Sequence, residues 1–297
     1  MDPTNDTRTT RYVTLFDSKY MIKGALMLDS LARHSASPYQ VEVVALDDCV
    51  TNAASGWSNV HVTKLADLEA AVPELRQARS SRSWREYCWT LGSVALRWFL
   101  GQTEPGEMVT YIDADLGFFS DPAACFAELG DRSIGIVPHS FAPAYQDYAA
   151  STGIYNVSWV SMRNDDVGRA CAEDWAGRVL ARCSEAECGD QRYLDAWPER
   201  YGAALHAFTS PGIGVAPWNV SAYRVENGHA VTVNEHPVVF YHYHEFRRET
   251  VPENRRGLCL DEFCLSGYPR IRSIDIDVFY RDYCRRYRAM AEELGVD

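Results

Sequence analysis

Two aspartates that could bind a metal ion, Asp113 and Asp115, stand two residues apart. They follow the apolar run 108–112, which has the composition of a buried strand. Side chains at i and i+2 near a strand end project to the same side, and two carboxylates held that close repel each other unless a divalent cation lies beside them. Mg²⁺ and Mn²⁺ prefer such oxygen ligands and also bind substrate phosphates. The pair therefore predicts a metal site beside a phosphate-bearing ligand.

Two histidines near the other end of the chain could complete this site. His242 and His244 follow the apolar run 238–241, which predicts a strand that delivers both rings to one edge. A neutral imidazole is a suitable third ligand for Mn²⁺ beside two carboxylates. The residues alone leave open the alternative of two surface or hydrogen-bonded histidines.

The elements that must position these side chains alternate between strands and helices. Residues 11–16 form a predicted strand, Asp17 or Ser18 caps a helix that runs to about residue 34, and residues 40–46 form a second strand. This opening is typical of a parallel sheet covered by helices, in which ligands bind beyond the carboxyl ends of the strands. Further predicted strands are 59–63, 107–112, 133–137, 155–162, 231–234 and 238–241, and further predicted helices are 82–100, 165–182 and 277–293, with others after Pro122 and Gly189.

The composition narrows the class of protein. The chain has 297 residues and a formal net charge of -12 at pH 7, so its average surface repels the phosphates of nucleic acid. No run approaches the roughly 20 apolar residues that a membrane helix needs, and residues 1–11 contain no apolar signal-peptide core. We expect a cytoplasmic protein, and peripheral contact with a membrane surface stays open.

Several segments, in order and with matching approximate spacing, carry a resemblance to a known family. YIDADLGFFSDP, at residues 111–122, is similar to the metal-binding segment of GT-A glycosyltransferases related to family 8 and to the nucleotide-diphospho-sugar transferases. The other similar segments are YVTLFDSKYMIKGALMLDSL, REYCWTLGSVALRWFL, GIYNVSWVSMRND, GDQRYLDAWPERYG, APWN and VVFYHYH, so the resemblance covers roughly residues 12–244. The family pattern often ends in His-Phe-x-Gly followed by Lys-Pro-Trp. This chain has neither the glycine nor the lysine there, so no phosphate-contacting lysine can be carried over.

The resemblance implies an α/β fold of the GT-A (Rossmann-like) type, with a mixed, mostly parallel sheet covered by helices on both faces. It implies a flexible tail at residues 1–10 and a single domain at 11–297. Within that domain we expect a nucleotide-binding half at 11–122, an acceptor and metal half at 123–250 and a C-terminal helical extension at 251–297. The implied activity is the metal-dependent transfer of a sugar, with retention, from a nucleotide-diphosphate sugar to a hydroxyl acceptor. Inversion, in which an Asp or Glu would deprotonate the acceptor, stays open. UDP is the expected nucleotide.

The resemblance also assigns residues to roles. Asp113, Asp115 and His242 would hold Mn²⁺ (or Mg²⁺), and Asp190 with Gln191 would lie at the reacting sugar. The expected donor-binding residues are Thr14, Phe16, Asp17, Arg85, Asp113, Ala114 and Asn156, of which Arg85 is chosen because arginine suits a phosphate. The expected acceptor-binding residues are Trp218, Asn219 and His244, and the first two are chosen for their residue types and their place in a shaped loop. Structural roles are the alternatives: a helix cap for Asp190, the core for Phe16 and Trp218, a buried turn for Asn156, and solvated surface for Arg85.

Two other functions compete with the glycosyltransferase. A sugar nucleotidyltransferase also needs carboxylates at a strand end and Mg²⁺, but it usually has a glycine-rich, basic loop after the first strand, which Asp17-Ser18-Lys19-Tyr20 is not. A non-catalytic carbohydrate-binding protein would not need the predicted metal ligands. The expected partners are a nucleotide-sugar donor and a hydroxyl-bearing acceptor, which could be a saccharide, a lipid-linked saccharide or a natural product. The oligomeric state stays open.

Overall fold

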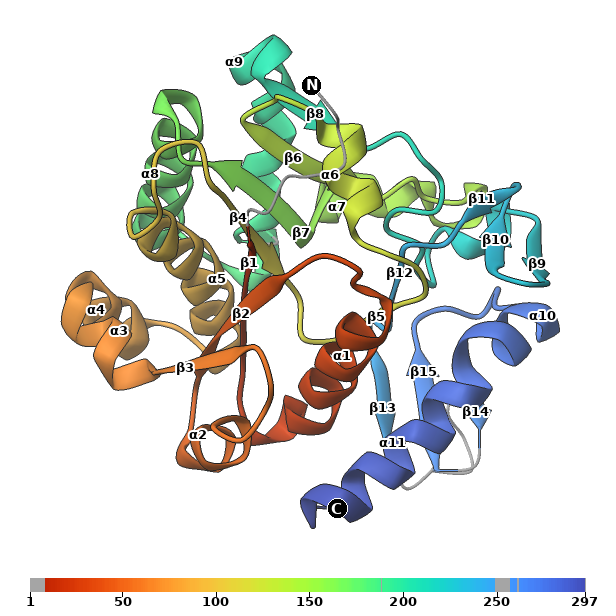
Figure 1. Ribbon diagram of the computed structural model, residues 1–297. Helices are drawn as coiled ribbons and strands as arrows, with labels where there is room; N and C mark the ends of the chain where they lie inside the picture. Colours follow the sequence, from red (N-terminus) through yellow and green to blue (C-terminus); the bar gives the residue numbers. More distant parts are fainter. Residues whose placement is uncertain (1–8, 188, 249–256, 261, 297) are drawn as a thin grey trace.

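The core of the protein is one twisted sheet of seven strands, seen in a computed structural model that describes residues 9–187, 189–248, 257–260 and 262–296 (Figure 1). The strand order is β3-β2-β1-β4-β7-β6-β8. Neighbouring strands are parallel except β7, which runs antiparallel to both β4 and β6. The predicted mixed, mostly parallel sheet is therefore confirmed. The strands are β1 Thr10–Phe16, β2 Tyr39–Ala45, β3 Val60–Lys64, β4 Met108–Ile112, β6 Ile134–Pro138, β7 Tyr155–Arg163 and β8 Leu205–Ala207.

Helices cover both faces of this sheet because its buried strands are apolar on both sides. In β1, Tyr12 and Phe16 pack with one group of helices, whereas Val13 and Leu15 pack with the other. The first group is α1 Met21–His34, α2 Asp48–Ala54 and α6 Ala123–Leu129. The second group is α3 Leu65–Ala71, α4 Glu74–Ser81, α5 Trp84–Leu100 and α8 Asp166–Ala181. The prediction of helices on both faces is confirmed.

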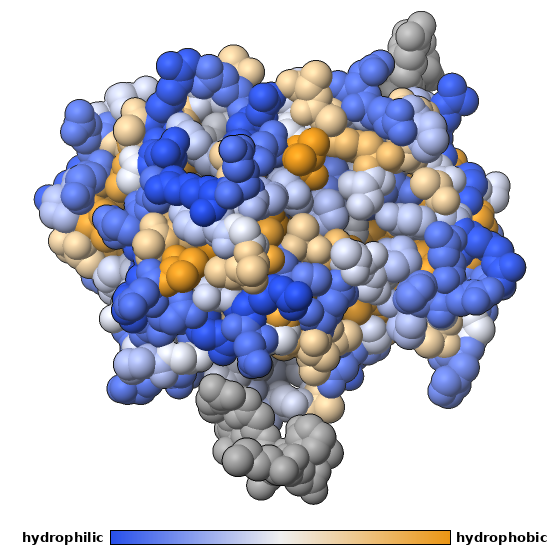
Figure 2. Space-filling model, turned by 90° about the horizontal axis from the view of Figure 1, so that it is seen from above, coloured by the Kyte–Doolittle hydropathy of each residue, from blue (hydrophilic) through white to orange (hydrophobic). Residues whose placement is uncertain are grey.

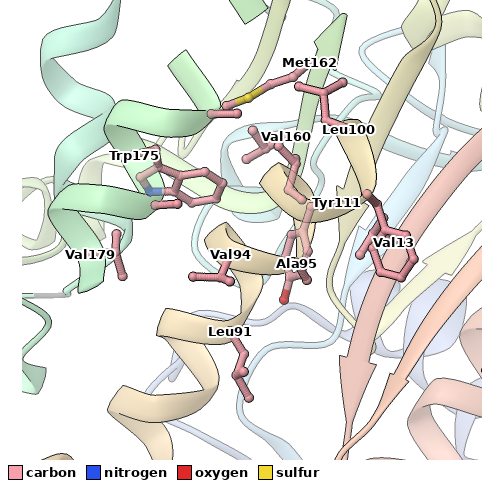
Figure 3. Packing of buried hydrophobic residues seen from close by; sticks show 14 of the residues in the cluster. Val13, Leu91, Val94, Ala95, Leu100, Tyr111, Val160, Met162, Trp175 and Val179 are labelled. Atoms are coloured by element: carbon pink, nitrogen blue, oxygen red, sulfur yellow. The ribbon is translucent and has the colours of Figure 1, made fainter. Parts of the chain in front are cut away.

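Helix α5 is the main support beneath β4. Ser83 and Glu86 form a capping box that starts the helix at Trp84, two residues later than the sequence predicts, because Arg82 is still extended. Figure 3 shows the buried side of α5 between the sheet and the Trp175 face of α8. Tyr111 of β4 belongs to this packed cluster, so the end of β4 rests on a rigid base.

The described part of the chain beyond residue 209 forms small sheets, one of which includes a strand from the first half of the chain, and a long closing helix. Strand β5 Leu116–Phe118 pairs with β12 Phe240–His242, and α11 Arg281–Leu294 packs against α1. The small sheets also contain β9 Val225–Asn227, β10 Val231–Val233, β11 His236–Pro237, β13 Phe246–Arg248, β14 Gly257–Leu260 and β15 Phe263–Ser266. The predicted extension at 251–297 thus contains strands ahead of its helices in the described part, whereas most of the predicted N-terminal tail, residues 1–8, lies outside the described residues.

Short helical segments occupy many of the connections. The helix predicted to begin at residue 18 opens with the 3₁₀ turn η1 Ser18–Tyr20, and α11 is preceded by α10 Ser273–Asp275 and the π-helical turn η7 Ile276–Tyr280. The remaining segments are η2 Pro143–Tyr148, α7 Ala149–Thr152, η3 Glu185–Glu187, η4 Gln191–Ala196, α9 Trp197–Tyr201, η5 Gly202–Ala204 and η6 Val220–Ala222.

Hydrophilic residues predominate on the face shown in Figure 2, and hydrophobic residues form small, separate patches there. Large exposed hydrophobic side chains are few among the described residues: Tyr20, Trp84, Tyr148, Ile154 and Ile274. No helix in the described part of the chain has the length and apolar character that a bilayer crossing requires.

Candidate metal centre and donor site

The pairing of β5 with β12 brings the three predicted metal ligands together. His242 lies opposite Leu116 in this ladder, and the Tyr243 amide donates to the Asp115 carbonyl at 2.9 Å. Ligand atoms of Asp113, Asp115 and His242 all lie within 4.8 Å of one another. The His242 Nε2 atom is 3.0 Å from Asp115 Oδ1 and 3.8 Å from Asp113 Oδ2.

The electrostatics of these three groups suit a divalent cation. Burial raises the pKa of Asp113 to about 6, although His242 opposes this shift. Burial also disfavours the charged form of Asp115, but His242 outweighs it and holds the pKa of that carboxyl below its usual range. The carboxylates in turn raise the pKa of His242 against the effect of burial. Two carboxylate oxygens and one imidazole nitrogen form a chemically appropriate donor set for Mn²⁺ or Mg²⁺, so the residues fit the predicted ion.

His244 lies beside this group without joining it. Its ring centroid is 5.5 Å from that of His242, and its Nδ1 atom is 2.8 Å from the Tyr268 hydroxyl. Burial lowers the pKa of His244 to about 3. Trp218 packs edge-on against both histidine rings, and its indole nitrogen donates to the His139 carbonyl at 2.9 Å. Trp218 is therefore the buried wall behind the histidines.

The loop around Trp218 uses Asn219 for its own framework. The Asn219 amide donates to the carbonyls of His139 and Gly214 and accepts from the Ala216 amide. Both of its N–H groups are thus used and the side chain is buried. Asn219 therefore shapes the loop in this structure, and its contact with an acceptor stays a prediction.

Asp190 lies close enough to the metal group for the charge of Asp113 to act on it, and Gln191 follows it in the chain. The Asp190 side chain makes no cap hydrogen bond to the 3₁₀ turn that follows, so the helix-cap alternative is not supported. Burial, reinforced by the charge of Asp113, raises the pKa of Asp190 to about 8. Asp190 is thus a buried carboxyl within electrostatic reach of a metal ligand.

A short hydrogen-bond chain holds Gln191. Its Nε2 group donates to the Thr152 carbonyl at 2.7 Å, and its Oε1 atom accepts from the Asn156 amide at 3.2 Å. The same Asn156 nitrogen lies 3.3 Å from His139 Nε2, and the Ser158 amide donates to Asn156 Oδ1. Burial lowers the pKa of His139 to about 3, so the ring can accept from the amide. Asn156 and Gln191, which were predicted separately, are therefore directly connected.

The other predicted donor-binding residues, at the ends of β1 and β4, differ from one another in their surroundings. The Thr14 hydroxyl is buried without a hydrogen-bond partner, and Ala114 is buried between the two metal carboxylates. Asp17 accepts from the Trp84 indole at 3.0 Å and from the backbone amide of the next turn. The Phe16 ring is buried over Gly24, which agrees with the core alternative, and its contact with a donor stays a prediction.

Arg85 lies on exposed surface, with its guanidinium 3.4 Å from Glu185 Oε2. The neighbouring cations are also engaged elsewhere, because Arg79 pairs with Glu69 and Arg82 donates to Thr90. No described contact links Arg85 to the carboxylate pair, and its contact with a diphosphate stays a prediction.

The cation nearest the carboxylates among those in the described ion pairs is one that sequence reasoning missed. The Lys23 ammonium lies 3.7 Å from Asp115 Oδ2 and 4.5 Å from the centre of the Tyr20 ring. Lys23 is the sole charged residue in the apolar run MIKGALML, and this was the available signal. A lysine inside a buried helical run is uncommon unless its charge has a partner.

Comparison with known proteins bears on the fold. No family model matches the chain. Among solved structures, that of mouse xyloside xylosyltransferase 1 is similar, with a TM-score of 0.51 and 13% identity over 79% of this chain and 97% of that one. The chain has the GT-A fold of glycosyltransferases. The GT-A fold places Asp113 and Asp115 at the carboxyl end of a central strand, where open α/β sheets bind ligands.

Two proteins of Bacillus subtilis (strain 168) are similar in sequence to this GT-A protein. The uncharacterized protein YfnD is 29% identical over 294 residues, which cover 96% of this chain and 91% of YfnD. The uncharacterized protein YfnF is 32% identical over 191 residues, which cover 60% of this chain and 63% of YfnF. The likeness to YfnD thus extends over nearly the whole chain.

Proposed function

We propose that this protein is a metal-dependent glycosyltransferase that moves a sugar from a nucleotide-diphosphate sugar, a UDP-sugar in the first instance, to a hydroxyl acceptor. The observation that carries the proposal is the group formed by Asp113, Asp115 and His242 at the carboxyl end of a central strand of the GT-A fold. A protein that only binds carbohydrate has no need for these three ligands, of which Asp115 and His242 are buried, beside a further buried carboxyl, Asp190.

The roles of the residues follow from their positions. Asp113, Asp115 and His242 would hold Mn²⁺ or Mg²⁺, which when bound neutralises negative charge on a leaving diphosphate. Asp190 and Gln191 would lie against the sugar. The pKa of Asp190 is raised to about 8, and its ionised form would stabilise positive charge that develops at the anomeric carbon, an interaction that burial strengthens. This supports transfer with retention, for which no strong base at the acceptor is needed.

Residues around the metal ligands and Asp190 are proposed to bind the donor and the acceptor. Thr14 and Asp17, at the end of β1, are proposed to contact the nucleoside. Asn156 would position Gln191 beside the donor sugar, because its amide nitrogen is shared between Gln191 and His139. On the acceptor side, His244 presents a neutral ring in front of the Trp218 wall. A hydroxyl acceptor on a sugar agrees with the name of the structurally similar xyloside xylosyltransferase, although that likeness concerns the fold.

A thermal-shift screen of nucleotide-sugars with Mn²⁺ tests the proposal and identifies the donor. A ligand that binds only the native state raises the melting temperature by mass action, so one donor should stand out in the presence of the ion. Release of a nucleoside diphosphate would then support sugar transfer, whereas release of pyrophosphate would indicate a nucleotidyltransferase. No stabilisation by any nucleotide-sugar, with or without Mn²⁺, would contradict the proposal.

A further inference from the structure

Lys23 occupies a position that is costly for a cation. Its side chain is only 7% exposed, and it lies in the first turn of α1, where the helix dipole is positive and disfavours a positive charge. A buried ammonium also loses its hydration and requires a charged or hydrogen-bonding partner in return. Helix formation does not require this lysine, because methionine and leucine have similar helix propensities and are far more often buried.

The partner of Lys23 in this structure is itself a candidate metal ligand. The ammonium is 3.7 Å from Asp115 Oδ2 and lies over the ring of Tyr20 in a cation–π contact. Glu245 is the next anion in its field, but Glu245 is paired with Arg247. Lys23 therefore depends mainly on a carboxylate that a divalent ion would also use.

The charges of the site indicate that it attracts an anion once it holds a divalent ion. Asp113, Asp115 and Lys23 together carry one net negative charge, and a divalent ion converts this to one net positive charge as long as the neighbouring Asp190 is protonated. A positive, poorly hydrated site attracts an anion strongly. A diphosphate supplies that anion, and it gains further negative charge when it becomes a leaving group.

The fold keeps Lys23 in this position. The Phe118 amide of β5 donates to the Ser30 hydroxyl of α1 at 3.0 Å, so the helix is anchored to the strand that follows the metal carboxylates. The long helix α11 packs on the other side of α1. The ammonium is thus held beside the metal ligands by rigid elements.

We propose that Lys23 is a diphosphate-binding residue of the donor site, which contacts the phosphate oxygens beside the ion held by Asp113, Asp115 and His242. This inference rests on the proposed function and adds to it a residue from α1. The competing role is that of a counter-ion for Asp115 that only competes with the metal.

Binding of Mn²⁺ alone and of inorganic pyrophosphate in the presence of Mn²⁺, both measured by calorimetry, separates these roles. In Lys23→Met, the loss of a charged contact should weaken pyrophosphate binding about 10- to 100-fold. Binding of Mn²⁺ alone should stay the same or become tighter, because a competing cation has been removed. Lys19→Met is the matched control, since Lys19 is an exposed lysine of the preceding turn and its loss should leave both affinities unchanged.

Pyrophosphate binding by Lys23→Met that equals the wild type would overturn the assignment and leave Lys23 as a counter-ion. If Lys23→Met does not fold, Lys23→Gln takes its place with the same two outcomes. A wild-type protein that binds neither Mn²⁺ nor pyrophosphate would overturn the proposed function as well, so the two failures are distinguishable.

Discussion

Asp190 links the chemistry of the site to a measurable property of the fold. Its carboxyl is buried, and burial together with the charge of Asp113 raises its pKa from 3.8 to about 8. In the unfolded chain the group regains water and titrates near its ordinary value. The informative perturbation is Asp190→Asn in metal-free protein, because it removes the ionisable group and retains its shape.

The sign of the effect follows from proton binding. The folded state binds the proton of Asp190 more tightly than the unfolded state does, so this contribution to stability is fully present below about pH 4. It is lost as the pH rises toward about 8. The free energy of unfolding falls by at most ~1.4 kcal/mol per pH unit, so the wild type loses up to ~3 kcal/mol between about pH 5 and pH 7. The variant has no ionisable group at this position and does not show this loss.

Urea unfolding of both proteins in the presence of EDTA, at about pH 5 and pH 7, gives the two free energies of unfolding. We expect the free energy of unfolding of the variant, relative to that of the wild type, to be roughly 2–3 kcal/mol higher at about pH 7 than at about pH 5. In an Asp113→Asn background the gain should be smaller, because one cause of the raised pKa of Asp190 has been removed. A difference that does not change with pH would refute the reasoning, since it would mean that the Asp190 carboxyl is solvated in the folded protein.

Three further predictions concern the metal group. His242→Ala should raise the Mn²⁺ concentration needed for half-maximal turnover, and an unchanged Mn²⁺ titration would transfer the ligand role to His244. Mn²⁺ affinity, measured by calorimetry between about pH 5 and pH 7.5, should rise with pH, because protons on Asp113 (pKa about 6) and on His242 compete with the ion; a flat profile would contradict this. Trp218→Ala should lower the free energy of unfolding by about 3–5 kcal/mol in urea melts, as for other buried tryptophans, and weaken Mn²⁺ binding by releasing both histidines; a loss below about 1 kcal/mol would show that the ring is not a buried wall.

The sequence is most informative where structure is local. An apolar strand, two aspartates and the turn before Pro122 stand next to one another, so both the end of β4 and the carboxylate pair could be predicted directly. His242 came from the resemblance, and its approach to the pair depends on the β5–β12 ladder, whose strands are more than a hundred residues apart in the chain. Periodicity says nothing about which distant strands pair.

The predicted site residues that lie away from the metal group share a physical reason for it. Phe16 and Asn219 carry groups that suit ligands, but their burial and their hydrogen bonds are set by tertiary packing that the sequence does not display. Arg85 stands out by charge within a basic cluster, yet it lies beside Glu185 on the surface. Lys23 was overlooked as a site residue because it is a single lysine in an apolar run that predicts the core.

The most direct test of the central claim is the release of nucleoside diphosphate from nucleotide-sugars, with and without an acceptor, by the wild type and by Asp115→Asn. The proposed function predicts release that depends on Mn²⁺ in the wild type and is abolished by EDTA. It predicts no release above background by a folded Asp115→Asn variant, which lacks the carboxylate nearest His242. Release that is equally fast without a divalent ion, or undiminished in Asp115→Asn, would contradict the account.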